Sequence, residues 1–454
     1  MKTVLLVILY TFSINSYSST VAVLDNGVDF THQALLSHIY TSSAELENGQ
    51  DDDENGYIDD ILGWNFITMS NSTFDFKREI YLTADIERYY YLRAKKTLNS
   101  ITEAESKEYD LLRKNEDLKE RRKKFVSWMH GTHVAGIAVN TKELPVEVSP
   151  SDLDVLSITY LGSATSGPAK SPDFKAISSR NTLKRQEHLN RYWKSYLNWQ
   201  LNKFHLGVKY AASKAQVVNG SFGQSFEGIQ KRIENYYEDQ FSKSMSKEAS
   251  FLKAASFMQE LINGSTKILD QYPNTLFVFS AGNKKNNSDS LIHFPSAIRL
   301  PNSLSVGASF DFQEMAYFSN YGKKTVDLFA PGMAIKSTIP RQGYLLTNGT
   351  SQASPYVANI AIKGLAQAKK LGLKLEISQL KTIILSTVIK KDELGSKSVS
   401  GGIIFPERVF QAIRNLEDHS LTKSIKYAIN QFPTKQAKPK NLSGQGLFLE
   451  LPDN

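Results

Sequence analysis

The chain of 454 residues contains no cysteine. This absence excludes disulfide bonds, cysteine nucleophiles and thiolate metal sites. The fold must therefore be stabilised by its hydrophobic core, and a bound ion is the other available source of stability. Hydrophobic residues make up 41% of the chain and charged residues 22%, which is typical of a soluble globular protein.

The chain also lacks an apolar segment long enough to span a bilayer. The apolar run at residues 4–12 is too short, follows Lys2, and precedes small residues that include Ser16 and Ser18. This pattern predicts a secretory signal peptide over residues 1–19 and a secreted or periplasmic protein. A buried N-terminal strand is the alternative interpretation. We expect no stable membrane insertion after signal removal, and a monomer.

The chain carries a net charge of +8. Much of the excess lies in residues 77–124, where 14 Lys and Arg are interspersed with 10 Asp and Glu. Mixed charge of this kind indicates a solvated helix surface, and we predict no nucleic-acid partner. The alternative, a nucleic-acid-binding protein, depends on net charge alone.

Short β-rich runs alternate with helical stretches, which predicts an α/β fold with a central, mostly parallel sheet and helices on both faces. The expected strands lie at residues 21–24, 154–158, 216–219, 276–279 and 303–306. Charged or amphipathic helical insertions are expected near residues 74–127, 165–205 and 225–270. After residue 415 the composition turns polar, and residues 416–454 are predicted to form a C-terminal tail. Polar residues that follow the strands should meet at the carboxyl edge of the sheet, where active sites of such folds lie.

The first candidate catalytic residue is Asp25, at the end of the apolar run VAVL. Gly27 allows the backbone to turn sharply after it. A carboxylate in this place can accept a hydrogen bond from an imidazole and select its tautomer. Considered alone, Asp-Asn-Gly is a turn signal without further function.

The second candidate is His130, which opens the segment HGTHVAGIA. The small residues that follow predict a helix that begins here and packs closely against another element. His130 and His133 are three residues apart, with no glutamate between them, so the segment lacks the His-Glu-x-x-His pattern of zinc proteases. His133 is interpreted as a packed, hydrogen-bonded helix residue.

The third candidate is Ser351 in the segment NGTSQASPYVA, at the start of an expected helix. Pro355 is tolerated there because the first helical turn has unpaired donors. The helix dipole and free N–H groups at this position favour an oxyanion. For this segment alone, an N-cap serine is the alternative. An α/β-hydrolase is disfavoured, because its triad runs Ser, Asp, His along the chain.

Together, these three segments and their order resemble the subtilisin-like serine proteases, also known as subtilases or peptidase family S8. The resemblance covers residues 20–415 apart from the three insertions, and implies a three-layer subtilisin-like catalytic domain. It implies a serine endopeptidase with Asp25, His130 and Ser351 as its triad, an acyl-enzyme intermediate, and no cofactor for catalysis. Protein or peptide substrates are expected. A catalytically inactive, subtilisin-like binding domain is the alternative.

Further segments match the same family. The strand and turn LFVFSAGN place Asn283 where the resemblance implies a side-chain donor to the oxyanion. The resemblance also implies two walls that bind substrate, the first able to pair with an extended peptide as an added strand. Their residues are Ser221, Phe222 and Gly223 on one side, and Ser280, Ala281 and Gly282 on the other.

An acidic segment, DDDENGYIDD, is a candidate metal site. Its oxygen-bearing side chains at positions one, three, five and nine, with glycine at six, follow the first part of a calcium loop. Leu62 at position twelve excludes a complete EF-hand. A structural calcium ion and a solvated acidic turn remain open alternatives. The candidate ligands are Asp51, Asp53, Asn55 and Asp59.

Overall fold

The computed structural model describes residues 18–162 and 170–433. Within them, ten strands form one sheet, in the order β11-β12-β8-β6-β5-β4-β1-β3-β2, with β7 pairing with β6. The strands are β1 Ser19–Asp25, β2 Gly63–Asn65, β3 Leu153–Thr159, β4 Val217–Gly220, β5 Leu276–Ser280, β6 Ser303–Phe310, β7 Glu314–Met315, β8 Leu328–Pro331, β11 Ile389–Lys390 and β12 Gly402–Ile403. A separate antiparallel pair consists of β9 Ile335–Ile339 and β10 Gly343–Thr347.

The five predicted strands are confirmed and stand side by side as β6, β5, β4, β1 and β3. All their mutual pairings are parallel. The antiparallel pairs of the large sheet lie at β11 with β12 and at the short β7. Strands β1, β4 and β5 are buried along their whole length, as expected for a sheet covered on both faces.

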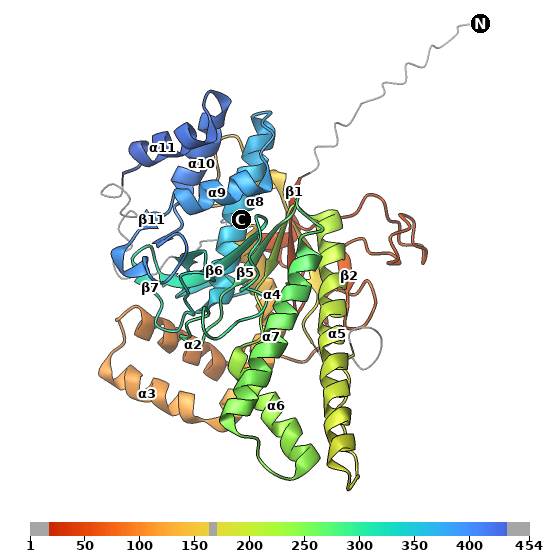
Figure 1. Ribbon diagram of the computed structural model, residues 1–454. Coiled ribbons are helices and arrows are strands. Elements are labelled where there is room, and N and C mark those ends of the chain that lie inside the picture. The colour runs from red at the N-terminus through yellow and green to blue at the C-terminus, as the bar shows by residue number, and fades with distance from the viewer. Residues whose placement is uncertain (1–17, 163–169, 434–454) are drawn as a thin grey trace, which may run out of the picture.

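Helices cover both faces of the sheet (Figure 1). They are α1 Gln33–Leu36, α2 Ala84–Thr97, α3 Glu103–Lys114, α4 Glu116–Ala138, α5 Thr182–Lys214, α6 Phe226–Phe241, α7 Lys247–Leu269, α8 Thr350–Lys370, α9 Ile377–Ser386, α10 Pro406–Arg414 and α11 Leu421–Gln431. Three 3-10 turns occur at Pro150–Asp152, Asp392–Leu394 and Asn415–Glu417.

Alternate residues of β1 separate the two main cores. Val21 and Val23 pack with α4, α8, α9 and α10, whereas Ala22 and Leu24 pack with α5, α6 and α7. This period-two division is what a strand between two helical layers requires. The predicted three-layer α/β fold is confirmed.

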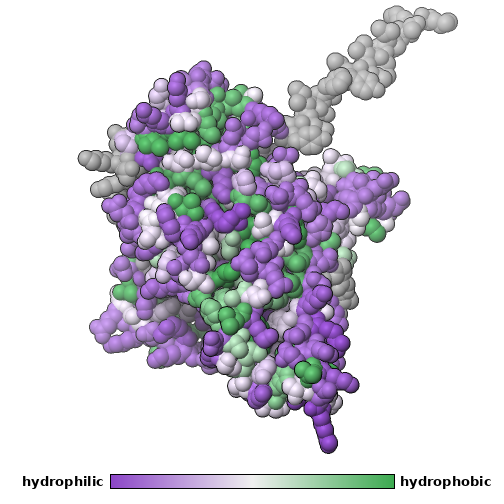
Figure 2. Space-filling model, in the orientation of Figure 1, coloured by the Kyte–Doolittle hydropathy of each residue, from purple (hydrophilic) through white to green (hydrophobic). Residues whose placement is uncertain are grey.

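Helices α2 to α7 occupy most of the described residues of the three segments interpreted as insertions. Helices α2, α3 and the first half of α4 build a third apolar cluster, which includes Tyr89, Phe125 and Trp128 and reaches the β9–β10 pair. Helices α5, α6 and α7 project beyond the lower edge of the sheet in Figure 1. The face of the molecule seen in Figure 2 is largely hydrophilic at its lower left, where Figure 1 places α2 and α3, in agreement with the solvated helix surface predicted for residues 77–124.

The ends of the domain differ from the predicted boundaries. Ser19, assigned above to the signal peptide, is the first residue of β1 and is buried; residues 1–17 of the predicted signal lie outside the described part. The segment expected to begin a polar tail at residue 416 instead contains α11. Ala428 of α11 is buried in the main core, because the helix presents one apolar face to α10. Residues 434–454 lie outside the described residues.

Among the described helices, none has the length and apolarity that crossing a membrane requires.

Candidate active site

Asp25 and His130 meet at the carboxyl edge of the sheet. Strand β1 ends at Asp25, whose side chain is fully buried, and Nδ1 of His130 lies 2.8 and 2.9 Å from the two carboxylate oxygens. The carboxylate also accepts a hydrogen bond from the backbone N–H of Asn26. Because Nδ1 is held by Asp25, the proton stays on that nitrogen and Nε2 keeps its lone pair.

Helix α4, which carries His130, begins earlier than predicted. The expectation that a helix starts at His130 is wrong, since α4 starts at Glu116 and His130 lies in its second half. The Asn115 side chain caps the helix by accepting from the N–H of Leu118. No proline interrupts residues 116–138, so the insertion and the histidine segment form one continuous helix.

Two glycines allow α4 to approach the end of β1. A Cβ on Gly131 would lie 2.2 Å from the carbonyl oxygen of Gly27, so only glycine fits at this contact. Gly27 itself has a φ of 92°, which favours glycine. The predicted close packing of the small residues after His130 is thus confirmed, and it sets the position of the imidazole against Asp25.

Ser351 is the second residue of α8 and is half-buried. Its hydroxyl donates to the carbonyl oxygen of Ser221 at 3.2 Å. In return, the Ser221 hydroxyl donates to the carbonyl oxygen of Ser351 and lies 2.9 Å from Oγ of Ser354. Ser221 follows β4 directly, so these contacts join the start of α8 to the carboxyl end of β4.

Asn283 is held beside Ser351 through Thr350. The Oδ1 atom of Asn283 accepts from both the N–H and the hydroxyl of Thr350, at 2.9 and 3.0 Å. The Thr350 hydroxyl in turn accepts from the N–H of Gly282. Because Oδ1 is held in this way, the Nδ2 group of the exposed Asn283 is oriented away from Thr350 and free to donate.

The two predicted substrate walls lie in different surroundings. Ser221, Phe222 and Gly223 line a cavity of about 590 Å³ together with His130. Ser280 is the last residue of β5, and Ala281 and Gly282 follow it. All three are buried, and the Ala281 carbonyl accepts from the Asn320 side chain.

The buried ring of His293 lies between these two walls. A Cβ on Gly223 would lie 2.2 Å from it and a Cβ on Gly282 would lie 2.9 Å from it, so both glycines leave room for this imidazole. Burial lowers the pKa of His293 to about 4, so the ring is neutral at neutral pH.

The two histidines of α4 have opposite electrostatic surroundings. Burial acts to lower the pKa of His130, but the charge of Asp25 and its hydrogen bond outweigh this, so the pKa is raised above 6.5. Burial, together with the nearby His130, lowers the pKa of His133 to about 4. His133 donates from Nε2 to the Leu345 carbonyl at 3.0 Å, as expected for a packed helix residue.

A comparison with protein families decides the classification. The model of the subtilase family matches residues 17–403, which is most of the chain. The chain belongs to the subtilase family. The predicted resemblance to subtilisin-like serine proteases is thereby confirmed.

Curated relatives of this subtilase are similar over part of its length. A subtilisin-like serine protease of Davidiella tassiana is 36% identical over 172 residues, covering 34% of the chain and 32% of the relative. The extracellular basic protease of Dichelobacter nodosus is 33% identical over 158 residues, covering 33% and 25%. The matches therefore span about a third or less of these relatives. A lanthipeptide protease of known structure aligns with a TM-score of 0.46 and 16% identity, covering 87% of this chain and 88% of its own.

The structure gathers part of the acidic segment into a cluster. Carboxylate oxygens of Asp51 and Asp53 lie within 4.8 Å of each other and of Glu45, a residue that the sequence pattern did not indicate. The Glu45 side chain is buried, with 4% of the residue exposed, and its Oε2 atom has no hydrogen-bond partner among the residues that the structure describes. Burial raises the pKa of Glu45, and the charges of Asp53 and Asp60 add to this effect.

One of the four predicted ligands, Asp59, is not part of this carboxylate cluster and accepts from the N–H groups of Asn48 and Gly49. Asn55 lies beside the cluster: its backbone N–H donates to Asp51 and Asp53, and its side-chain oxygen accepts from the N–H of Tyr57. The reason is local: the loop closes on itself through these side-chain-to-backbone bonds.

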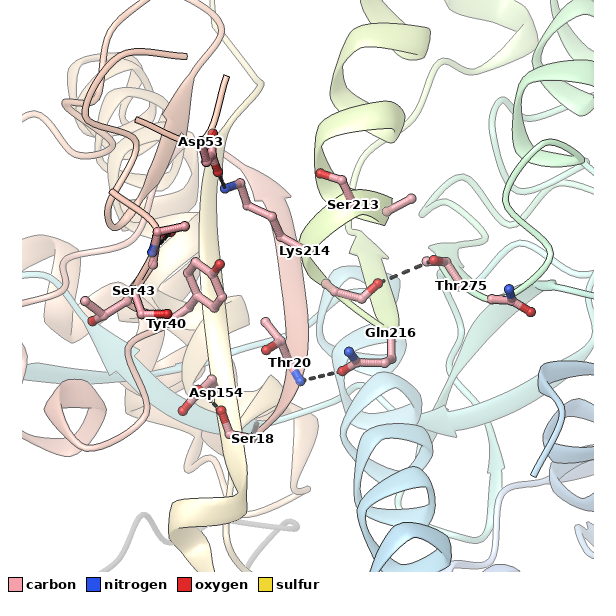
Figure 3. Close-up of a pocket in the computed structure, with 16 residues that line it drawn as sticks. Ser18, Thr20, Tyr40, Ser43, Asp53, Asp154, Ser213, Lys214, Gln216 and Thr275 are labelled. Atoms are coloured by element: carbon pink, nitrogen blue, oxygen red, sulfur yellow. Dashed lines mark hydrogen bonds and ion pairs between the residues drawn. The ribbon is translucent and has the colours of Figure 1, made fainter. Parts of the chain in front are cut away.

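Lys214 partly balances the acidic charge. Its Nζ atom lies 3.4 Å from Asp53 and 3.2 Å from Asp60. Figure 3 shows Lys214 directed at Asp53 across a cavity of about 950 Å³. This cavity also contains Thr20, near the start of β1, so it lies at the edge of the sheet opposite the candidate active site.

Three positions of the site were missed by the sequence interpretation. Thr350 holds Asn283, Ser354 contacts Ser221, and Glu45 joins the acidic cluster. Thr350 and Ser354 lie inside the recognised serine segment, but only their contacts distinguish them from other small residues. Glu45 precedes the acidic segment by six residues, and its burial is a property of the fold alone.

Proposed function

We propose that this subtilase is an active serine endopeptidase that hydrolyses peptide bonds in protein or peptide substrates as a monomer. The observation that carries the proposal is the hydrogen bond from His130 Nδ1 to the buried carboxylate of Asp25, at 2.8 Å. This bond leaves Nε2 of His130 as a base that faces a cavity lined also by Ser221. The Ser351 hydroxyl donates a hydrogen bond to the Ser221 carbonyl oxygen.

The proposed reaction begins when the Ser351 hydroxyl leaves the Ser221 carbonyl and turns to Nε2 of His130. His130 removes the proton as Oγ attacks the substrate carbonyl carbon, and Asp25 stabilises the imidazolium that forms. The tetrahedral intermediate collapses when His130 gives the proton to the leaving amine. Water, deprotonated by the same imidazole, then releases the acyl group from Ser351.

Two donors are proposed to stabilise the oxyanion. They are the Nδ2 group of Asn283 and the backbone N–H of Ser351 in the first turn of α8. The Thr350 contacts described above hold the Asn283 amide in one orientation, so it requires little reorganisation during the reaction.

The test of this function is labelling with a fluorophosphonate, combined with cleavage of a broad panel of fluorogenic peptides. We expect a covalent adduct on Ser351, identified by peptide mass spectrometry, and cleavage that the reagent abolishes. If the folded protein neither reacts with the reagent nor cleaves any peptide, the alternative of an inactive binding domain replaces this proposal.

The substitution Asn283→Ala is expected to lower kcat by about 10² to 10³, with KM little changed. This range is the one measured for the equivalent donor of subtilisin, a member of the same family. The effect falls on kcat because the amide donates to charge that exists only in the transition state. Steady-state kinetics on one good peptide substrate measure it.

Thr350 supplies the matching control for this prediction. Thr350→Val removes one of the two bonds to Asn283 and should lower kcat less than Asn283→Ala does, whereas Thr350→Ser should restore it. A kcat for Asn283→Ala within threefold of wild type would remove Asn283 from the mechanism.

We propose that Glu45, Asp51 and Asp53 hold a structural calcium ion. The chemistry fits, because carboxylate oxygens are ligands that Ca²⁺ prefers, and the unpaired, buried Oε2 of Glu45 lacks any other partner among the described residues. The ion would neutralise the clustered charge and hold the loop against the domain.

Calcium at about 100 times its dissociation constant is expected to stabilise the protein by about 3 kcal/mol, or roughly 3–4 °C in melting temperature, relative to EDTA. Differential scanning calorimetry in 5 mM calcium and in EDTA measures the shift. Glu45→Gln should largely abolish it, whereas Asp59→Asn, which removes a charge outside the cluster, should retain it. Equal melting temperatures of the wild type in both buffers would contradict the site.

We propose a secreted or periplasmic location. The predicted signal peptide supports it, as does the relative named an extracellular basic protease.

A further inference from the structure

The cavity beside His130 has a wall that the insertion supplies. Ser221, Phe222 and Gly223 form one side, and one face of α4 forms another. The α4 residues of this wall are Lys119, Arg122, Lys123, Val126, Ser127 and His130. Their spacing of three and four residues is that of a single helix face, so the catalytic histidine and three cations point into the same space.

The distance of the α4 cations from His130 follows from the geometry of the helix. A helix rises 1.5 Å per residue, so Lys123 is about 10 Å along the axis from His130, and Lys119 is about 16 Å away. An extended peptide advances about 3.3 Å per residue. A substrate that runs along α4 therefore passes the cations at about three to five residues from the scissile bond.

The charge of this wall is not neutralised within the cavity. Among the described residues, no Asp or Glu lines it. Lys119 and Lys123 pair with Glu116 and Glu120 on their own helix, but these are exposed pairs that contribute little and exchange readily with other partners.

Arg122 is the most firmly held of the three cations. Its guanidinium carbon lies 3.6 Å from the ring centroid of Tyr89, which is itself buried in the insertion's cluster. No hydrogen bond or ion pair to Arg122 is formed within the described part of the chain, and its Nε atom is buried without a partner. The insertion thus presents a pre-positioned guanidinium that forms no ion pair with any described residue.

We propose that this subtilase selects substrates with an acidic side chain three to five residues from the scissile bond, on the side of the peptide that lies along Ser221–Gly223. Lys119, Arg122 and Lys123 bind that side chain. The inference rests on the proposed peptidase function and adds a substrate class to it: acidic peptide segments. It gives the first insertion a role in recognition.

Binding is tested first, on the Ser351→Ala variant, so that turnover is not required. Fluorescein-labelled peptides that carry one Glu, moved along an otherwise neutral sequence, are compared with the same peptides carrying Gln. At low salt we expect about fivefold to tenfold tighter binding for Glu at the favoured position, as two or three half-exposed ion pairs provide. The preference should shrink as salt is raised to 0.5 M.

Variants assign the preference to α4. Lys123→Glu changes an exposed side chain and should reverse the preference, so that a Lys peptide binds better than the Glu peptide. Arg122→Gln removes the cation that packs on Tyr89 and should weaken the preference for Glu. If loss of the Tyr89 contact destabilises the fold of this variant, Lys123→Glu still tests the inference. Lys374→Glu changes net charge equally at a site just past the carboxyl end of α8, the end opposite Ser351, with 91% of the side chain exposed, and should leave the preference intact.

The cleavage profile separates this inference from the proposed function. Cleavage of neutral peptides with equal binding of Glu and Gln peptides would overturn the acidic preference and leave the peptidase function standing. Charge-dependent binding without any cleavage or labelling of the wild type would overturn the peptidase function and keep the recognition surface. A preference that survives Lys123→Glu and Arg122→Gln would also overturn the inference.

Discussion

Replacing Ser351 by alanine is expected to lower kcat by four to six orders of magnitude, the range that loss of the nucleophile gives in serine proteases of this kind. The folded structure should persist, because the lost hydroxyl makes a single 3.2 Å hydrogen bond to the Ser221 carbonyl. The variant should also lose all reaction with a fluorophosphonate. Single-turnover cleavage of a fluorogenic peptide and intact mass after labelling measure the two effects.

Ser354 provides a matched control on the same helix. Its hydroxyl contacts Ser221 as part of the same network and lies one turn further along α8. Ser354→Ala removes an equally small group and should change kcat by less than about tenfold, as loss of one hydrogen bond does. Similar losses in both variants would mean that the network, and not a nucleophile, had been tested.

Asp25→Asn is expected to lower kcat by about 10⁴. The asparagine can occupy the same space, but its amide permits the imidazole tautomer that carries its proton on Nε2. In that tautomer Nε2 has no free lone pair and cannot accept the proton of Ser351. Asp25 also raises the pKa of His130, despite the burial that lowers it. The wild type should therefore gain activity with rising pH, with a midpoint above 6.5, as neutral His130 forms.

The pH profile distinguishes this role from a structural one. Once the carboxylate charge is lost, the remaining activity of Asp25→Asn should rise at a lower pH than that of the wild type. Asp29 is a second buried carboxylate near the end of β1, which accepts from the backbone of Thr31 and Arg341. Asp29→Asn should lower stability and leave the pH midpoint in place. An unchanged midpoint in Asp25→Asn would show that Asp25 does not set the pKa of His130.

The accuracy of the sequence interpretation varied with the kind of signal. Strands were located well, because β1, β3, β4, β5 and β6 are near-continuous apolar runs buried on both faces. The start of α4 was misplaced, because the small residues after His130 look like a new helix while the charged residues before it continue the same one. The tail boundary was misplaced for a related reason: α11 buries only one narrow stripe, so its composition remains polar.

The calcium loop shows a second limit. The spacing of Asp51 and Asp53 could be read from the chain, and the structure brings their oxygens together. Glu45 could not be inferred, since its burial and its unpaired oxygen depend on how a separate stretch of loop folds back. Asp59 had the right spacing but bonds to Asn48 and Gly49, because backbone donors closer to it compete for its oxygens.

By itself, the sequence determined the α/β class and the family, and it predicted Asp25, His130, Ser351 and Asn283 as site residues, because each belongs to a short segment with its own local pattern. Only the tertiary structure decided that Thr350 holds Asn283, that Ser351 rests on Ser221, and that three cations of the insertion share a helix face with His130. These are contacts between residues 67 and 130 positions apart in the sequence, or directions set by one unbroken helix. Side-chain direction over such distances depends on packing, which local composition does not encode.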